Sequence, residues 1–221
     1  MRTSYSAIKL WERCPQAWAY RYIDKLPDKA GAAAQRGTRI HAAGERYLKG
    51  EIPIENLPVA YKPFLGSLEL AKRLGANAEA VWVCGKDWKT HYEENDTSWI
   101  KSIVDMSYIV GDELHIVDFK TGRDYPEHTQ QLELYMIMGA ARFPTVKSVH
   151  AACWYLDKGE EGHNAYYKQD WLKLLRRPWE ERVEVIAADK KHPATPSIPN
   201  CKWCAFGKSK GGPCHMEFTD A

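Results

Sequence analysis

The 221-residue sequence predicts one α/β domain, and three observations support this fold class. Helical hydrophobic patterns fill the first third of the chain, and strand-like and helical stretches alternate after it. The length favours a single domain. The hydrophobic fraction of 44% and the charged fraction of 27% suit a chain that buries a core. We therefore expect a mainly helical part over residues 1–76, an α/β core over 77–192 and an irregular tail over 193–221.

The N-terminal part contains the signals that begin and end helices. Ser4 or Ser6 can cap the first helix, and Cys14-Pro15 marks an interruption in it. Gly50 and Gly75 follow the next two helical patterns as stop signals. The helices are expected over residues 4–26, 32–48 and 58–74.

The central part changes to the pattern of strands, with β-branched and aromatic residues concentrated in short runs. Strands are expected over residues 79–84, 99–110, 113–119, 148–156 and 165–168. Helices are expected over 127–141 and from the cap Asp170 to about Lys190, and the Pro-rich stretch 193–199 excludes a regular helix.

The charge of the chain is nearly balanced, with 31 Lys and Arg against 29 Asp and Glu. This balance excludes a histone-like polycation and a long acidic tail. Residues 1–50 are nevertheless basic, which suits contact with a polyanion but also arises when charged helix faces are unevenly scattered. No run of 18 apolar residues exists and the first residues lack an apolar signal region, so we expect a cytoplasmic protein without a membrane span.

An acidic hairpin is the sharpest feature of the sequence. Gly111-Asp112 is a two-residue turn candidate between two β-rich runs. If it forms the turn, Asp105 and Asp118 lie directly opposite each other, and Lys120 shares their face of the strand. Facing carboxylates are unfavourable unless a cation compensates them, and Mg²⁺ is the natural choice. The alternative is a surface hairpin whose acids are solvated.

The motifs around this hairpin resemble those of the PD-(D/E)XK nucleases, and specifically the RecB-type exonucleases that include CRISPR-associated and phage relatives. Asp105 followed by Asp118-Phe-Lys-Thr-Gly122 carries the resemblance. Three further segments match in order. They are residues 37–41, which end in a histidine, residues 131–135, which have a Gln-x-x-x-Tyr pattern, and the opening helix from Ser4 through Cys14-Pro15 to Tyr20.

The resemblance implies a restriction-endonuclease-like mixed sheet flanked by helices, forming one nuclease domain over residues 1–221. It also implies a Mg²⁺ or Mn²⁺ site and a set of catalytic residues. The metal ligands would be His41, Asp105, Asp118 and the backbone carbonyl of Phe119, and the catalytic residues Asp105, Asp118, Lys120, Gln131 and Tyr135. Glu79, at the head of a predicted strand, is a candidate acidic supporter of this site.

The function that the resemblance implies is a metal-dependent exonuclease. It would act on single-stranded DNA or DNA ends during DNA processing or recombination in a prokaryotic or phage-infected cell, with recombination or CRISPR-type partner proteins. The alternatives are a DNA-binding iron–sulfur or zinc module without nuclease activity and a structure-specific endonuclease. Candidate phosphate contacts are Arg13, Arg21, Arg36 and Arg39. Trp11, Trp18 and Tyr20 are candidates for stacking on bases, although aromatic residues at such spacings more often form core.

Six cysteines in a chain expected in a reducing compartment favour metal ligation over disulfides. Cys201 and Cys204 form a C-x-x-C motif in the tail, and Cys214 follows. The resemblance adds Cys14 and implies a 4Fe–4S cluster that docks the tail on the N-terminal helix. The alternative is structural Zn²⁺, bound by the same four thiolates or with His215 in place of Cys14. Cys84 and Cys153, in predicted strands, are expected in the core.

Overall fold

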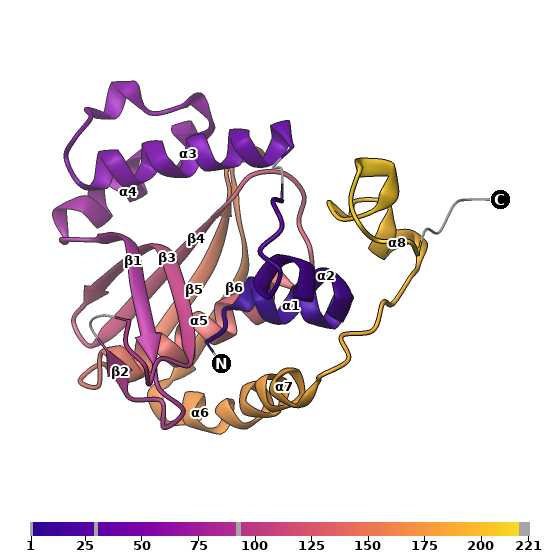
Figure 1. The fold of residues 1–221 in the computed structure, drawn as a ribbon. Helices are drawn as coiled ribbons and strands as arrows, with labels where there is room; N and C mark the ends of the chain where they lie inside the picture. Colours follow the sequence, from indigo (N-terminus) through magenta and orange to yellow (C-terminus); the bar gives the residue numbers. More distant parts are fainter. Residues whose placement is uncertain (1, 29–30, 92–93, 217–221) are drawn as a thin grey trace. The chain divides into compact units, whose positions relative to one another are not determined.

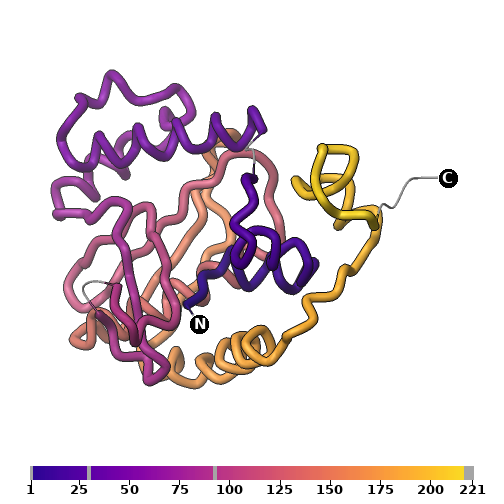
Figure 2. Tube along the Cα trace, in the orientation of Figure 1, coloured from indigo at the N-terminus to yellow at the C-terminus, as the bar shows by residue number. Residues whose placement is uncertain are grey.

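The chain separates into two compact units in the computed structural model, which describes residues 2–28, 31–91 and 94–216. The terminal unit comprises residues 3–31 and 180–221, and the sheet unit comprises Arg2 and residues 32–179. The trace in Figure 2 follows both units from the indigo N-terminus to the yellow C-terminus. The expectation of a single nuclease domain over residues 1–221 stays a prediction.

The terminal unit joins the two ends of the chain. Its helices are α1 (Tyr5–Arg13), α2 (Pro15–Tyr22), the second half of α7 (Arg176–Ala188), α8 (Ile198–Cys201) and the 3₁₀ turn η3 (Lys208–Lys210). The Ser4 hydroxyl accepts a hydrogen bond from the Ala7 N–H (3.3 Å), as the sequence predicts for a cap. The tail contacts the end of α1, because the side chains of Thr195 and Asn200 donate to the Arg13 carbonyl at 2.7 and 2.8 Å.

The sheet unit is built on a six-stranded mixed sheet (Figure 1). The strand order is β2-β1-β3-β4-β5-β6, and only the β4–β5 pair is parallel. The strands are β1 (Asn77–Cys84), β2 (Thr90–His91), β3 (Ile100–Val110), β4 (Glu113–Lys120), β5 (Ser148–Tyr155) and β6 (Glu160–Lys168). This arrangement, with helices flanking the sheet, confirms the predicted fold class.

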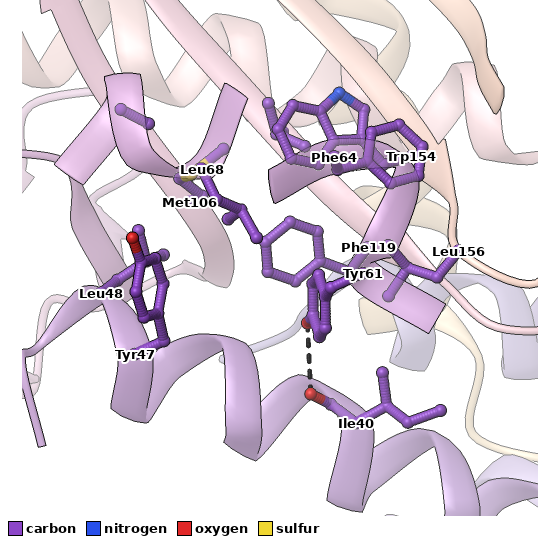
Figure 3. Packing of buried hydrophobic residues seen from close by; sticks show 12 residues of the cluster. Ile40, Tyr47, Leu48, Tyr61, Phe64, Leu68, Met106, Phe119, Trp154 and Leu156 are labelled. Atoms are coloured by element: carbon purple, nitrogen blue, oxygen red, sulfur yellow. Dashed lines mark hydrogen bonds between the residues drawn. The ribbon is translucent and has the colours of Figure 1, made fainter. Parts of the chain in front are cut away.

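Helix α3 (Ala32–Leu48) packs against one face of this sheet together with the 3₁₀ turns η1 (Ile54–Asn56) and η2 (Val59–Phe64) and helix α4 (Leu65–Arg73). The hydroxyl of Tyr61 donates a hydrogen bond to the Ile40 carbonyl (3.1 Å), and Phe64 stacks on Trp154 with 4.6 Å between ring centroids (Figure 3). The buried cluster consists of Ile40, Tyr47, Leu48, Tyr61, Phe64, Leu68, Ala71, Met106, Val117, Phe119, Trp154 and Leu156.

Helix α5 (His128–Arg142) packs against the opposite face of the sheet. A methyl group added at Gly139 would lie 2.6 Å from Leu114 and 3.2 Å from Ile116, so this helix approaches β4 closely. Leu114 and Ile116 alternate along β4 with Val117 and Phe119, which explains why the two helical layers meet different sets of side chains. The short helix α6 (Gln169–Leu174) follows β6.

Several element boundaries differ from the sequence-based expectation. The expected helix over 58–74 begins as the 3₁₀ turn η2, which contains Pro63. The expected last helix divides into α6 and α7 around Leu175, and Asp170 lies within the first turn of α6 instead of capping it. Strand β6 begins at Glu160, earlier than expected, and β2 has no counterpart in the prediction. No described helix is long and apolar enough to cross a membrane.

Candidate active site

The hairpin of β3 and β4 has the predicted register. Gly111 adopts a positive φ of 61° in the turn, and Val110 pairs with Glu113. The regular ladder ends at the pair Met106↔Val117. Asp105 and Asp118 occupy the next pair of positions along the two strands, just beyond the regular pairing. Their side chains are therefore placed where the sheet becomes irregular.

A left-handed residue on β1 marks the same level of the sheet. Glu79 has a φ of 48° and lies between the pairs Ala78↔Met106 and Ala80↔Val104, so it falls opposite Asp105. Non-glycine residues rarely adopt this conformation, and such residues gather at functional sites. The sequence indicated Glu79 only as a supporting acid, and the structure places its carboxylate within the cluster.

Asp105 is the centre of this cluster and is 8% exposed. One of its oxygens lies 3.2 Å from Nδ1 of His41, and the other accepts a hydrogen bond from the Phe119 N–H at 2.6 Å. The carboxylate thus replaces the backbone acceptor that a regular ladder would offer to Phe119. One ligand atom each from His41, Glu79 and Asp105 lies within 4.8 Å of the others, which is the spacing of a metal-binding group.

Asp118 is the first member of a second chain of polar contacts. Its carboxylate forms a buried ion pair with Lys120. The Lys120 ammonium donates to Oε1 of Gln131 (2.7 Å), and the Gln131 amide donates to the Tyr135 hydroxyl (2.8 Å). Gln131 and Tyr135 are one helical turn apart on α5, so one helix face completes this chain of contacts.

The electrostatics of the site favour bound protons and cations. Burial, followed by the charges of Asp105 and Glu45, raises the pKa of Glu79 to about 7. Burial also raises the pKa of the Asp118 carboxyl, against the attraction of Lys120. Burial acts to lower the pKa of Lys120, but the neighbouring Asp118 carboxylate outweighs it and holds that pKa above its usual value. Burial is the main cause of the raised pKa of both acids, and the charge of the neighbouring Asp105 carboxylate adds to it.

His41 follows the same pattern. Burial favours its neutral form, but the hydrogen bond and charge of Asp105 outweigh burial and raise the pKa of the imidazole. Helix α3 brings His41 to this point because its small residues allow a close approach to the sheet. A methyl group at Gly37 would lie 2.9 Å from the Thr121 hydroxyl, and one at Gly44 would overlap the Tyr61 hydroxyl at 2.3 Å.

A salt bridge fixes the loop that follows Lys120. The Arg36 guanidinium holds Asp157 through two hydrogen bonds of 2.9 and 2.6 Å, and Asp157 accepts the Gly122 N–H at 2.9 Å. The Arg36 hydrogen bonds hold the pKa of the Asp157 carboxyl below its usual range. The sequence offered no signal for Asp157, because it follows β5 far from the motifs.

The structure thus brings most of the predicted site residues together in the sheet unit. These residues are His41, Asp105, Asp118, Lys120, Gln131 and Tyr135. The roles assigned to them stay predictions, as does ligation by the Phe119 carbonyl. Of the candidate phosphate contacts, Arg36 and Arg39 are exposed on α3, and Arg36 is held by Asp157. Arg13 and Arg21 are exposed in the terminal unit, where Arg21 pairs with Asp28 at 2.7 Å.

The four candidate cluster cysteines lie in the terminal unit and line one cavity. The cavity wall also includes Tyr20 and Phe206, whose rings are 5.6 Å apart. Burial, and then the neighbouring Cys14 and Cys214, contribute to the raised pKa of Cys204. Trp18 is buried and packs against His192, so it serves the core of this unit. Cys84 and Cys153 are fully buried, which confirms the core prediction for both.

Comparison with known proteins identifies similar chains. Residues 2–209 match the family model described as the PD-(D/E)XK nuclease superfamily. The crystal structure of SSO0001 is 15% identical with a TM-score of 0.50, and the match covers 99% of this chain and 88% of that one. A protein of Eubacterium rectale named a "putative exonuclease" is 10% identical with a TM-score of 0.54, and the match covers 100% and 91%. No curated protein matches the chain.

Proposed function

Because the chain belongs to the PD-(D/E)XK nuclease superfamily, we propose that it is a Mg²⁺- or Mn²⁺-dependent deoxyribonuclease. The observation that carries this proposal is the convergence of Asp105, Asp118 and Lys120 at the irregular end of the β3–β4 ladder. A buried pair of facing carboxylates beside a charged lysine is an unfavourable arrangement for stability alone, and it suits a cation and a phosphate substrate.

The cation would be held by His41, Glu79 and Asp105, with Asp118 as the neighbouring carboxylate. Carboxylate oxygens with one imidazole suit Mg²⁺ or Mn²⁺ better than a thiolate-preferring metal. When bound, such an ion stabilises the negative charge that develops on a phosphate during hydrolysis. Glu79 extends the ligand set that the sequence predicted, and Asp118, which pairs with Lys120 through Oδ2, would offer its other oxygen, Oδ1, to the ion.

Lys120 supplies the positive charge that the chain itself directs at the reaction. Asp118 keeps the ammonium charged, and the Gln131 carbonyl oxygen orients it. A fixed ammonium beside the scissile phosphate stabilises the transition state without reorganising at the moment of reaction. Gln131 and Tyr135 act as positioning residues in this arrangement, because they hold Lys120 from one face of α5.

The substrate is proposed to be single-stranded DNA or a DNA end, and the reaction an exonuclease digestion. Support comes from the name of the similar Eubacterium rectale protein and from the basic first quarter of the chain. Arg39, exposed on α3 two residues before His41, is a candidate phosphate contact. Recombination or CRISPR-type partners and a cytoplasmic location stay predictions.

A 4Fe–4S cluster bound by Cys14, Cys201, Cys204 and Cys214 is proposed for the terminal unit. Tetrahedral zinc, with Zn–S bonds of about 2.3 Å, would hold its thiolates ~3.8 Å apart. Among the described residues, no three cysteine sulfurs lie within 4.8 Å of one another, although all four line one cavity. A shared cavity wall suits a cluster and a single ion alike, and the motif resemblance favours the cluster. Such a cluster would fasten a tail of little regular structure to α1 and α2.

A degradation assay tests the nuclease proposal. Wild-type protein with Mn²⁺ should digest linear labelled single-stranded DNA, while Asp118→Asn should be inactive and Asp112→Asn, at the exposed turn of the same hairpin, should retain activity. Resistance of circular single-stranded DNA would support an exonuclease, and its cleavage an endonuclease. If the wild type binds DNA but digests none of these substrates with Mg²⁺ or Mn²⁺, the proposal is wrong and a DNA-binding module is favoured.

The cluster assignment has its own test, which does not depend on nuclease activity. Anaerobically purified protein should contain iron and acid-labile sulfide and absorb broadly in the visible range. A colourless protein with one equivalent of zinc would replace the cluster by the zinc alternative.

A further inference from the structure

A second group of metal-binding side chains lies in the sheet unit, apart from the cluster around Asp105. One ligand atom each from Asp124, His128 and His163 lies within 4.8 Å of the others. The three residues come from the loop after β4, the first turn of α5 and strand β6. Two imidazoles with one carboxylate form an open ligand set typical of zinc and related transition metals.

Hydrogen bonds hold both imidazoles from the outside. Nδ1 of His128 lies 2.7 Å from the Tyr155 hydroxyl, which donates to Asp124 at 2.8 Å. Nδ1 of His163 lies 2.8 Å from the Thr129 hydroxyl, while its Nε2 is within hydrogen-bond distance of the Asp124 carboxylate. Metal-binding histidines are usually oriented by a partner on the second ring nitrogen. Because Nδ1 of each ring has its own partner, Nε2 is the ligand atom on each ring, and on His163 that atom already contacts Asp124.

The backbone of β6 is irregular at His163, the residue that contributes the second imidazole. The β5–β6 ladder shifts its register between the pairs Ala151↔Ala165 and Cys153↔Gly162, which leaves one extra residue on β6. His163 lies in this bulge and has a φ of 45°. Bulges redirect side chains, and a left-handed non-glycine residue is costly unless its surroundings require it. The irregular backbone directs the His163 ring toward Asp124.

A comparable triad elsewhere in the sheet lacks the irregular backbone. Glu113, His115 and His150 also lie within 4.8 Å of one another. However, His115 and His150 are direct partners in the regular parallel ladder of β4 and β5, so their proximity follows from register alone. This triad therefore provides a matched control, with two imidazoles and one carboxylate.

We propose that Asp124, His128 and His163 bind one divalent transition-metal ion of the zinc class at a site distinct from the catalytic cation site. The ion would join the loop after Lys120 to β6 and to the start of α5. His128 lies three residues before Gln131 on that helix, so the ion would fix the helix end that positions Lys120.

Zinc stoichiometry tests the proposal. Calorimetric titration of the wild type and of a His128→Gln, His163→Gln double variant should differ by one zinc equivalent, while His150→Gln should match the wild type. Any metal held at the cysteines is the same in all three proteins and cancels in the comparison. Asp118→Asn should retain the equivalent, which separates this site from the proposed nuclease site. Equal stoichiometry in the wild type and the double variant would overturn the proposal.

A measurement on the unaltered protein covers the case in which the double variant fails to fold. Diethyl pyrocarbonate modifies exposed imidazoles, and mass spectrometry identifies the modified residues. One equivalent of zinc added to protein whose cysteine site is already filled should slow the modification of His128 and His163 at least tenfold and leave that of His150 unchanged. Unchanged modification of His128 and His163 would contradict the site, whatever the behaviour of the variants.

Discussion

Two neighbours of different kinds hold the Lys120 ammonium. Asp118 compensates the charge, and Gln131 sets the direction of the ammonium without adding charge. Removing Asp118 altogether would leave a buried lysine unpaired, which commonly costs several kcal/mol. Asp118→Asn is the better test of activity than Asp118→Ala because the amide keeps the shape and a hydrogen-bond acceptor.

Gln131→Ala should reduce the rate of DNA cleavage about tenfold, because a hydrogen bond to a charged group contributes ~1.5 kcal/mol or more. Tyr135→Phe should have a smaller effect, because it loosens Gln131 alone. Single-turnover rates and DNA binding should be measured for both variants. An unchanged rate with weakened DNA binding would instead show that these residues hold the DNA strand.

Glu79 should contribute to the affinity for the catalytic cation. Glu79→Gln keeps the size of the side chain and removes one carboxylate charge from the group with His41 and Asp105. We expect Mn²⁺ to bind about tenfold more weakly, equivalent to ~1.4 kcal/mol. Calorimetry with Mn²⁺ measures this effect, and Asp112→Asn serves as the control. Equal affinity in Glu79→Gln would remove Glu79 from the ligand set.

At the level of elements, local signals predicted the parts whose geometry is local. The Gly111-Asp112 turn defined the register of β3 and β4, and the hydrophobic pattern defined α3 over residues 32–48. The left-handed backbone of Glu79 and the bulge at His163 were not predictable, because each depends on neighbouring strands. Neither residue is a glycine, so the sequence contains no conformational signal at these positions.

Substitution by alanine should change the stability of the protein in opposite directions at two glycines. One lies where α3 closely approaches its neighbours, and the other lies in open space on α4. At Gly44, an added methyl group would meet the buried Tyr61 and Phe119 rings, so Gly44→Ala should destabilise the protein by about 1–3 kcal/mol. It should also reduce activity, because His41 lies one turn away. At Gly66 on α4 nothing lies within 4 Å, so Gly66→Ala should stabilise by about 0.5 kcal/mol.

Urea denaturation of both variants measures these changes. Equal stability of Gly44→Ala and the wild type would mean that α3 is able to move away from the sheet without cost. Such a result would weaken the argument that this contact positions His41.

At the scale of the whole chain, the side chains that could bind metals are of two kinds, one kind in each unit. Oxygen and imidazole ligands gather in the sheet unit, and thiols line the cavity of the terminal unit. The terminal unit consists of the two ends of the chain, so any group that links Cys14 to Cys201 closes almost the whole sequence into a loop. Closing a loop of that length favours the folded state mainly by restricting the unfolded one.

Loss of one centre should therefore leave the metal affinity of the other intact. Cys201→Ser should remove the visible absorption of the proposed cluster and expose the tail over residues 193–216 to trypsin, since the short helix α8 and the turn η3 offer little regular structure of their own. Its affinity for Mn²⁺ should stay within twofold of the wild type. Asp105→Asn should give the reverse, with the absorption and trypsin resistance retained and Mn²⁺ affinity lost. Weakened Mn²⁺ binding in Cys201→Ser would show that the thiol centre also supports the catalytic cluster.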